Sequence, residues 1–242
     1  NSVRGSQLKT LVLRCNQKGD TVAALFVKDD NFPKIDEFEK LAKGIQVCYS
    51  NPKSPASVMT KELYLYGDVT LTDKILGKEL YYDVHSFFQV NLPVFETALK
   101  VMKQTIGDKK CIDFYCGVGA IGVSVGNTQT FIELDERNCY YAKKNVAQES
   151  QIIHVSSEQA LDYIEKDSVL IVDPPRAGLH TKFIDRIKDV KPLMIAYLSC
   201  NPSTQARDLA ILQDGYKLHC LEGYNFFPRT PHIESLAVMI RR

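Results

Sequence analysis

The sequence lacks the features that mark several classes of protein. Its seven cysteines include no Cys-x-x-Cys pair, so we expect neither a disulfide framework nor a metal site. No apolar run approaches the ~18 residues of a membrane helix, and the segment Asn1–Gly5 does not resemble a signal peptide. We therefore expect a monomer without membrane association, in a reducing, cytoplasmic compartment.

Neither positive nor negative charge is in excess. The 30 basic and 29 acidic side chains give a formal net charge of +1, so any binding of nucleic acid would depend on a local patch. The 242 residues, 45% of them hydrophobic, are enough for one large domain or two unequal ones.

The first third of the chain predicts a small β-rich module. Its apolar patterns indicate one helix at 35–43, ending at Gly44, and short strands at 8–14, 21–27, 45–49, 61–66, 69–71 and 79–84. The chain enters the first strand abruptly, so we expect 1–83 to be an incomplete central α+β domain with further sequence upstream.

From Val94 onward, strands alternate with helices, which is typical of an α/β domain over 84–242. We expect strands at 110–115, 130–134, 152–155, 169–173, 193–198, 216–222 and 235–240. Helices are expected at 94–106, 121–125, 136–149, 157–165, 182–188 and 203–212. No helix fits between the last two strands, so the prediction is a seven-stranded, mostly parallel sheet whose last strand is antiparallel.

A glycine-rich turn follows the first of these strands. In Asp113–Gly122, Gly117 and Gly119 would let a ligand approach the backbone, and Glu133 at the end of the next strand suits a ribose diol. Dinucleotide enzymes and adenosylmethionine enzymes share this arrangement, so it predicts a ribose-containing cofactor without fixing its chemistry. The alternative is a tight turn beside a solvated Glu133.

Two further side chains follow strands at the same edge of the sheet, and a third comes just before the last strand. Asp173 is held in Asp173-Pro-Pro-Arg-Ala-Gly178, where it either positions a ligand or caps the next helix. Cys200, after a buried strand and before Asn-Pro, suits a nucleophile whose thiolate is favoured by nearby donors or by the helix that starts at Ser203. Glu234 suits a general base, although without the other residues it would be interpreted as an ordinary carboxylate at the rim of the sheet.

Two flanking segments add candidates for contact with a base. Phe87 could stack on a base or belong to the core, and Gln89 offers both a donor and an acceptor. His232, two residues before Glu234, is expected to support the loop rather than to react.

Five motifs together resemble the RNA uracil-C5 methyltransferases, which make 5-methyluridine in tRNA or 23S rRNA from S-adenosylmethionine. The motifs, in the family's order, are Ser86-Phe-Phe-Gln-Val-Asn91, Asp113-Phe-Tyr-Cys-Gly-Val-Gly119, Asp173-Pro-Pro-Arg-Ala-Gly178, Ser199-Cys-Asn-Pro202 and Phe227-Pro-Arg-Thr-Pro-His-Ile-Glu234. The resemblance spans 84–242 and implies a Rossmann-like class I methyltransferase fold, with 1–83 resembling the family's central domain more loosely.

The resemblance also implies roles for single residues. Cys200 matches the nucleophile and Glu234 the general base. The cofactor would be held by Gln89, Tyr115, Gly117, Gly119, Glu133 and Asp173, and the target base would meet Phe87, Gln89 and Asp173. Ala120 stands where some relatives have Asn, which puts one cofactor contact in doubt. An iron–sulfur cluster, which many relatives carry, would lie only in upstream sequence.

The resemblance implies an RNA partner, with rRNA slightly favoured over tRNA as the substrate. Two other functions remain open: a noncatalytic RNA-binding or assembly factor on a methyltransferase scaffold, and a cytosine-C5 RNA methyltransferase, which also uses a cysteine. An exocyclic-amine methylase is disfavoured because Arg176 occupies the position of that family's aromatic residue.

Overall fold

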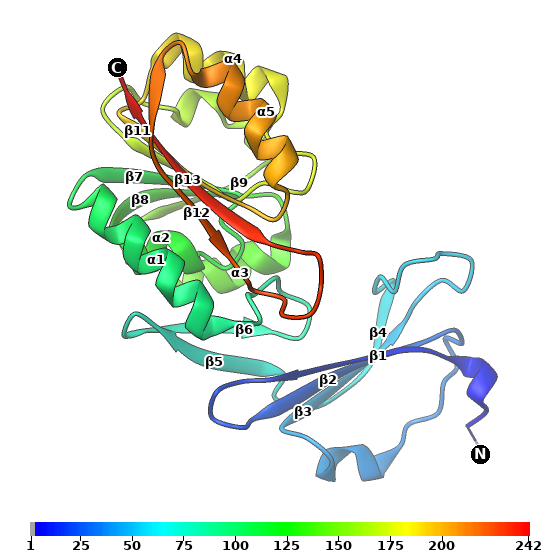
Figure 1. Ribbon diagram of the computed structural model, residues 1–242. Helices are drawn as coiled ribbons and strands as arrows, with labels where there is room; N and C mark the ends of the chain where they lie inside the picture. The colour runs from blue at the N-terminus through cyan, green and yellow to red at the C-terminus, as the bar shows by residue number, and fades with distance from the viewer. Residues whose placement is uncertain (1–2) are drawn as a thin grey trace. The chain divides into compact units, whose positions relative to one another are not determined.

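The computed structural model describes residues 3–242 (Figure 1). Asn1 and Ser2, the start of the segment compared with a signal peptide, lie outside the described residues. The chain divides into two compact units. One contains the chain up to Asp73 together with Tyr81–Ser86, and the other contains Lys74–Leu80 and Phe87–Arg242. The identities assigned to 1–83 and 84–242 stay predictions.

The first unit is built on a four-stranded sheet in the order β1-β2-β3-β4. Its strands are β1 (Leu8–Cys15), β2 (Thr21–Val27), β3 (Gly44–Tyr49) and β4 (Lys61–Gly67), preceded by the short 3-10 helix η1 (Gly5–Gln7). Strands β2 and β3 are parallel and the outer pairs are antiparallel. A small apolar core lies on one face, around Phe32, Val47 and Tyr66.

A hairpin of β5 (Thr70–Ile75) and β6 (Lys78–Asp83) follows, and the division between the units passes through it. Its base belongs to the first unit. There the Tyr82 hydroxyl donates to Asp73 Oδ2 at 2.5 Å, and Asp83 Oδ1 accepts from the backbone N–H groups of His85 and Ser86.

The predicted helix at 35–43 is wrong in type and length. The structure has only the five-residue 3-10 helix η2 (Asp36–Lys40), and Gly44 begins β3 rather than ending a helix. Gly44 is needed for a different reason: a Cβ there would lie 2.4 Å from the backbone of Asp68. Close strand approach, not helix capping, therefore explains this glycine.

The second unit contains a seven-stranded sheet in the order β12-β13-β11-β10-β7-β8-β9. Its strands are β7 (Lys110–Phe114), β8 (Asn127–Glu133), β9 (Gln151–His154), β10 (Val169–Val172), β11 (Met194–Ser199), β12 (Tyr216–Tyr224) and β13 (Glu234–Arg241). β13 runs in the opposite direction to the other six strands, because it pairs antiparallel with both β11 and β12. The predicted sheet is confirmed, and its antiparallel last strand lies between two others.

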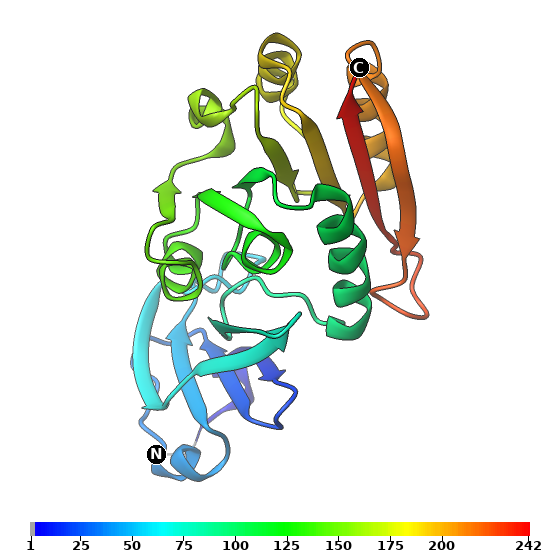
Figure 2. The ribbon, with the colours of Figure 1, turned by 90° about the vertical axis from the view of Figure 1, so that its left-hand side faces the viewer.

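Helices cover both faces of this sheet (Figures 1 and 2). Their bounds are α1 (Leu92–Ile106), α2 (Ala120–Val125), α3 (Glu136–Asn145), α4 (Thr181–Val190) and α5 (Pro202–Leu212). α1, α2 and α3 lie on one face, and α4 and α5 on the other, where Phe183, Ile187 and Leu212 pack against the strands. No helix within residues 3–242 is long and apolar enough to span a membrane.

Two predicted helices differ from the structure. The segment 157–165 forms two 3-10 turns, η3 (Ser157–Gln159) and η4 (Leu161–Tyr163), because the chain bends at the fully buried Ala160. α3 ends at Asn145 rather than at residue 149, and the Asn145 amide donates instead to the carbonyl of Val118 in the glycine-rich turn. This bond ties α3 to the loop that follows β7.

Strand order locates the place where this fold binds ligands. The chain leaves β7 toward β8 on one side, whereas β10 pairs with β7 on the other side. In open α/β sheets, ligands bind beyond the carboxyl ends of the strands where the order reverses in this way. The expected place is therefore the crevice between the residues that follow β7 and those that follow β10.

Candidate active site

A pocket lies at this reversal point and is lined only by residues of the second unit. Its empty volume, part of which is open to solvent, is about 320 Å³, and Tyr115, Gly117 and Asp173 line it beyond the ends of β7 and β10. Phe87 and Gln89 line it from the segment before α1. Five of the residues selected from the sequence therefore share one cavity.

The glycine-rich turn forms one wall. Gly117 has a φ of +55°, and a Cβ there would find only one atom within 4 Å, the Phe87 carbonyl oxygen at 3.9 Å. Glu133 fixes the turn because its Oε2 accepts from the Gly117 N–H at 2.7 Å, while Oε1 accepts from Leu134 and Asp135 at 2.9 and 2.8 Å. A carboxylate has about four acceptor sites, so Glu133 can accept a further hydrogen bond.

Asp113, at the base of the turn, is fully buried in β7. Its Oδ2 accepts from the Gly122 N–H at 2.9 Å, while its Oδ1 has no partner among the described residues. Burial raises the pKa of Asp113 well above its ordinary value, and the charges of Asp173 and Glu133 raise it further. Asp113 therefore joins β7 to α2 in surroundings that disfavour its charged form.

Strand register brings Cys200 and Glu234 to one edge of the sheet. Ser199, the last residue of β11, pairs with Ser235 of the antiparallel β13. Cys200, which comes after Ser199, and Glu234, which comes before Ser235, therefore lie side by side. Glu234 is 4% exposed, whereas Cys200 is partly exposed directly after β11. Parallel pairing of Val172 with Tyr197 places Asp173 beyond the same edge.

The cluster is electrostatically unusual. Burial raises the pKa of Glu234 to about 6, an effect that Arg176 partly offsets. Burial and the charge of Glu234 raise the pKa of Asp173 to about 8. Raised pKa values of this kind are common at functional sites, where neighbouring carboxyl groups bind protons with unequal affinity.

The prediction that the Cys200 environment favours the thiolate is wrong for the chain alone. Burial raises the pKa of Cys200, and the charges of Glu234 and Asp173 raise it further, while Arg176 lowers it. The helix that follows begins at Pro202, and the residue at its N-cap is Asn201, whose side chain accepts the Ser203 N–H. Burial and two nearby acids therefore outweigh the donors expected from the sequence.

The remaining predicted residues take different places. Phe87 is 61% exposed at the rim of the pocket, while Gln89 is buried in its wall. Gly119, with a φ of +84°, is the N-cap of α2 and does not line the cavity; neither does Glu133. Tyr115 is half-buried, and burial raises its pKa to about 12.

The loop before β13 is anchored at its start and has contacts within itself near its end. Phe226 is 1% exposed, packs edge-on against Phe95 at 5.9 Å, and accepts the Asn91 amide at its carbonyl. The His232 ring meets Phe227 edge-on at 6.4 Å, and its backbone N–H donates to Thr230. His232 therefore contacts the loop, as the sequence suggested.

Sequence reasoning missed the role of Arg176 and of the helix behind it. Arg176 is the cation whose charge acts on both Cys200 and Glu234. Its carbonyl is bound by Asn201 and Thr204 of the segment that forms α5. A signal for this contact exists: Thr204, Arg207 and Asp208 have i, i+3 and i+4 spacing and lie on one helix face.

Comparison with known proteins identifies the family. The family model for tRNA (uracil-5-)-methyltransferases matches residues 57–242. The chain belongs to this family. Its fold is accordingly the class I methyltransferase fold that the motifs predicted, with the candidate site at the usual edge of the sheet.

Individual relatives agree. An uncharacterized RNA methyltransferase of Lactobacillus johnsonii is 31% identical over 95% of this chain and 56% of its own length. One of Nanoarchaeum equitans is 34% identical over 85% of this chain and 47% of its own length. The chain thus spans about half the length of these relatives.

A solved structure is also similar. It is the Pyrococcus abyssi tRNA (uracil-54, C5)-methyltransferase in complex with S-adenosyl-L-homocysteine, with a TM-score of 0.83 and 27% identity. The match covers 96% of this chain and 60% of that protein. Within residues 3–242, no group of three or more His, Cys, Asp or Glu side chains is arranged to hold a metal ion.

Proposed function

We propose that this chain transfers a methyl group from S-adenosylmethionine to C5 of a uridine in RNA, giving 5-methyluridine. The observation that carries the proposal is the convergence of Cys200 and Glu234 at the end of β11 and β13, beside Asp173 of the pocket. Membership of the uracil-C5 methyltransferase family supports it.

The pocket suits S-adenosylmethionine. Gly117 leaves room for close approach. Glu133 lies next to the lining, bonded to the Gly117 N–H, and retains acceptor capacity that a ribose hydroxyl could use. Gln89, Tyr115 and Asp173 complete the wall and would orient the rest of the cofactor. When bound, the cofactor supplies an electrophilic methyl group on a sulfonium.

Cys200 supplies the nucleophile that the uracil ring needs. C5 of uracil is a poor nucleophile, but addition of a thiolate to C6 leaves an enolate whose electron density is at C5. The Cys200 thiol must first lose its proton to solvent, and the charge of Arg176 favours that loss. The raised pKa of Cys200 favours the uncharged thiol in the chain alone.

Glu234 completes the reaction as the base. Once C5 carries the methyl group, its carboxylate removes the C5 proton, and the electron pair of that C–H bond expels the Cys200 thiolate from C6. A pKa of about 6 keeps Glu234 ionised at neutral pH and still basic enough for this transfer. The chain's own groups therefore account for both the addition and the elimination.

The substrate base must leave its stack to reach Cys200. Phe87, 61% exposed at the pocket rim, offers a ring on which an extruded base can stack. The motif resemblance slightly favours 23S rRNA, but the Pyrococcus abyssi neighbour is named for tRNA uracil-54. We therefore propose tRNA as the first substrate to test and 23S rRNA as the second.

Product analysis tests the proposal. The 242-residue chain is incubated with methyl-labelled S-adenosylmethionine and either tRNA or 23S rRNA transcripts, and the digested nucleosides are identified by mass spectrometry. We expect labelled 5-methyluridine from one RNA and none with Cys200→Ala. Labelled 5-methylcytidine would assign the cytosine reaction instead, and RNA binding without any methylated product would assign a noncatalytic role.

A further inference from the structure

Helix α5 holds the loop that carries Asp173 and Arg176. The Asn201 amide and the Thr204 hydroxyl donate to the Arg176 carbonyl at 2.9 and 3.2 Å. Arg207 Nη2 donates to the next carbonyl, that of Ala177, at 2.9 Å. The loop is thus attached at consecutive peptides to the helix that starts two residues after Cys200.

The attachment continues to the end of the loop. The Leu179 N–H donates to Asp208 Oδ2 at 2.8 Å. Gly178 fits against Arg207 and Asp208 because it has no side chain. A Cβ there would lie 2.6 Å from Asp208 Oδ2 and 2.8 Å from Arg207 Nη2. Its φ of +79° likewise suits glycine.

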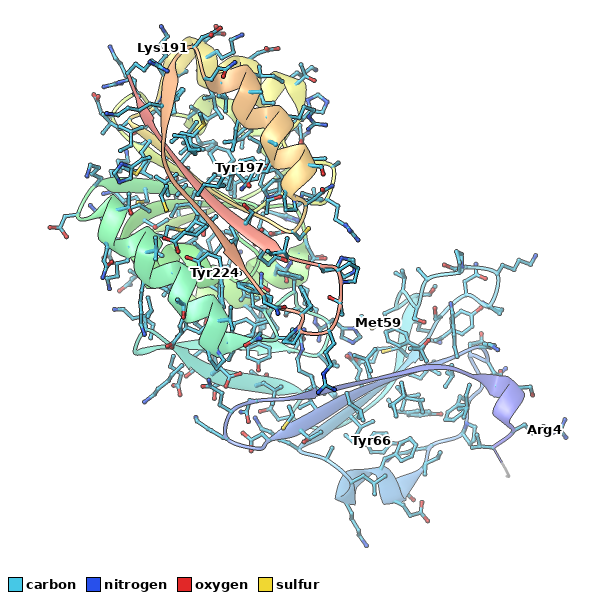
Figure 3. All side chains as sticks on the ribbon, in the orientation of Figure 1. Arg4, Met59, Tyr66, Lys191, Tyr197 and Tyr224 are labelled. Carbon is cyan, nitrogen blue, oxygen red and sulfur yellow. The ribbon has the colours of Figure 1, made fainter. Side chains whose placement is uncertain are left out.

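Asp208 is anchored in turn to the sheet. It is fully buried, and its Oδ2 also accepts from the hydroxyl of Tyr197 in β11 at 3.0 Å (Tyr197 is labelled in Figure 3). Its Oδ1 accepts from Arg207 Nε and Nη2 at 2.9 and 2.7 Å. A buried carboxylate with four such bonds is satisfied and rigid.

Cys200 lies between these attachments, after β11 and before α5. We propose that Thr204, Arg207 and Asp208 are positioning residues that hold Arg176 beside the Cys200 thiol. The proposal rests on the proposed function in taking Cys200 as the nucleophile. It predicts that loosening the loop moves the Arg176 charge away from the thiol, so that Cys200 needs a higher pH to ionise.

The test measures ionisation of Cys200 without RNA or cofactor. The rate of Cys200 alkylation by iodoacetamide is followed against pH by mass spectrometry of the Cys200 peptide. Arg207→Lys keeps the charge but loses the planar fork that bridges Asp208 and Ala177. We expect its alkylation midpoint to rise by about half to one pH unit.

Arg186→Lys is the matched control because Arg186, on α4, donates to Leu161 O and is not among the loop's partners. It should leave the midpoint unchanged. Thr204→Val is the second variant, to be used if Arg207→Lys does not fold. It removes one hydroxyl donor to the Arg176 carbonyl and should shift the midpoint in the same direction by a smaller amount.

A double-variant cycle separates positioning from general loosening. Arg176→Ala alone should raise the midpoint, and Arg207→Lys added to it should then have no further effect. An equal shift by Arg207→Lys with and without Arg176, or no shift at all, would overturn the proposal. If the midpoints shift as expected but the native chain does not methylate RNA, that result would count against the proposed function alone.

Discussion

Cys200, Asp173 and Glu234 share one small region in which ionising any one of them opposes ionising the others. The pKa of each is raised, by burial first and then by a neighbouring acid in the cases of Cys200 and Asp173. Their positions at strand ends could be predicted from the sequence, because a motif after a strand locates a side chain at the sheet edge. The direction of the Cys200 shift could not, because it depends on which charges from distant segments meet there.

Stability should therefore depend on the ionisation of Glu234. Its folded-state pKa of about 6 lies above the ordinary 4.5, so the folded chain binds this proton more tightly than the unfolded chain. Stability is then fully present below the ordinary pKa and falls as pH rises through the interval between the two values. The shift corresponds to about 2 kcal/mol above that interval.

We expect Glu234→Gln to be more stable than the native chain at pH 8, by up to about 2 kcal/mol, and nearly equal to it at pH 4. Urea unfolding followed at both pH values measures this difference. A variant that is less stable by the same amount at both pH values would show that ionisation of Glu234 does not destabilise the fold.

At the scale of elements, β7, the glycine-rich turn and α2 pack closely around Gly122. A Cβ at Gly122 would lie 2.5 Å from the Phe131 ring and 2.7 Å from Asp113 Oδ2. Gly119 is different: its φ is +84°, but a Cβ there would meet its nearest side chain at an ordinary 3.5 Å. The two glycines are thus needed for different reasons.

Alanine substitution should separate these reasons. Gly122→Ala should cost about 1–3 kcal/mol through overpacking, and it should also weaken S-adenosylhomocysteine binding because Phe131 and Asp113 must shift. Gly119→Ala should cost only about 1 kcal/mol, through its backbone conformation. Denaturant unfolding and calorimetric titration measure both effects. A larger loss for Gly119→Ala than for Gly122→Ala would contradict this assignment.

The sequence predicted all seven strands of the larger sheet, most clearly the buried apolar runs of β10, β11 and β13, but it predicted helices in two segments that do not form them. The segments 35–43 and 157–165 have helical apolar spacing, yet each forms only 3-10 turns. Local spacing cannot show that Ala160 is drawn into the core or that Gly44 must approach the Asp68 backbone. The contacts of Thr204 with the Arg176 loop were equally out of reach, since they join segments 28 residues apart.

At the scale of the whole molecule, the candidate site belongs to one of two compact units. The residues that line the pocket all lie within Phe87–Arg242, and none comes from β1–β4. The net charge of +1 gives the chain no overall attraction to a polyanion, so the RNA binding that the proposed function requires would depend on local groups.

Ligand binding should consequently protect one unit selectively. With S-adenosylhomocysteine at about 100 times its Kd, the binding unit gains about 2.7 kcal/mol of stability. Hydrogen exchange read by mass spectrometry should then slow at 113–122 and 173–179, while peptides from 8–49 remain unchanged. Protection confined to 8–49 would place the cofactor outside the pocket.

The most direct test of the whole account is to trap the enzyme on RNA. Glu234→Gln removes the base that ends the reaction, so with RNA and S-adenosylmethionine this variant should accumulate a covalent complex that survives denaturation. Peptide mass spectrometry should find Cys200 joined to a methylated uridine, and the additional change Cys200→Ala should abolish the complex. Normal methylation of uridine by the Cys200→Ala chain, or a linkage through any other residue, would contradict the account.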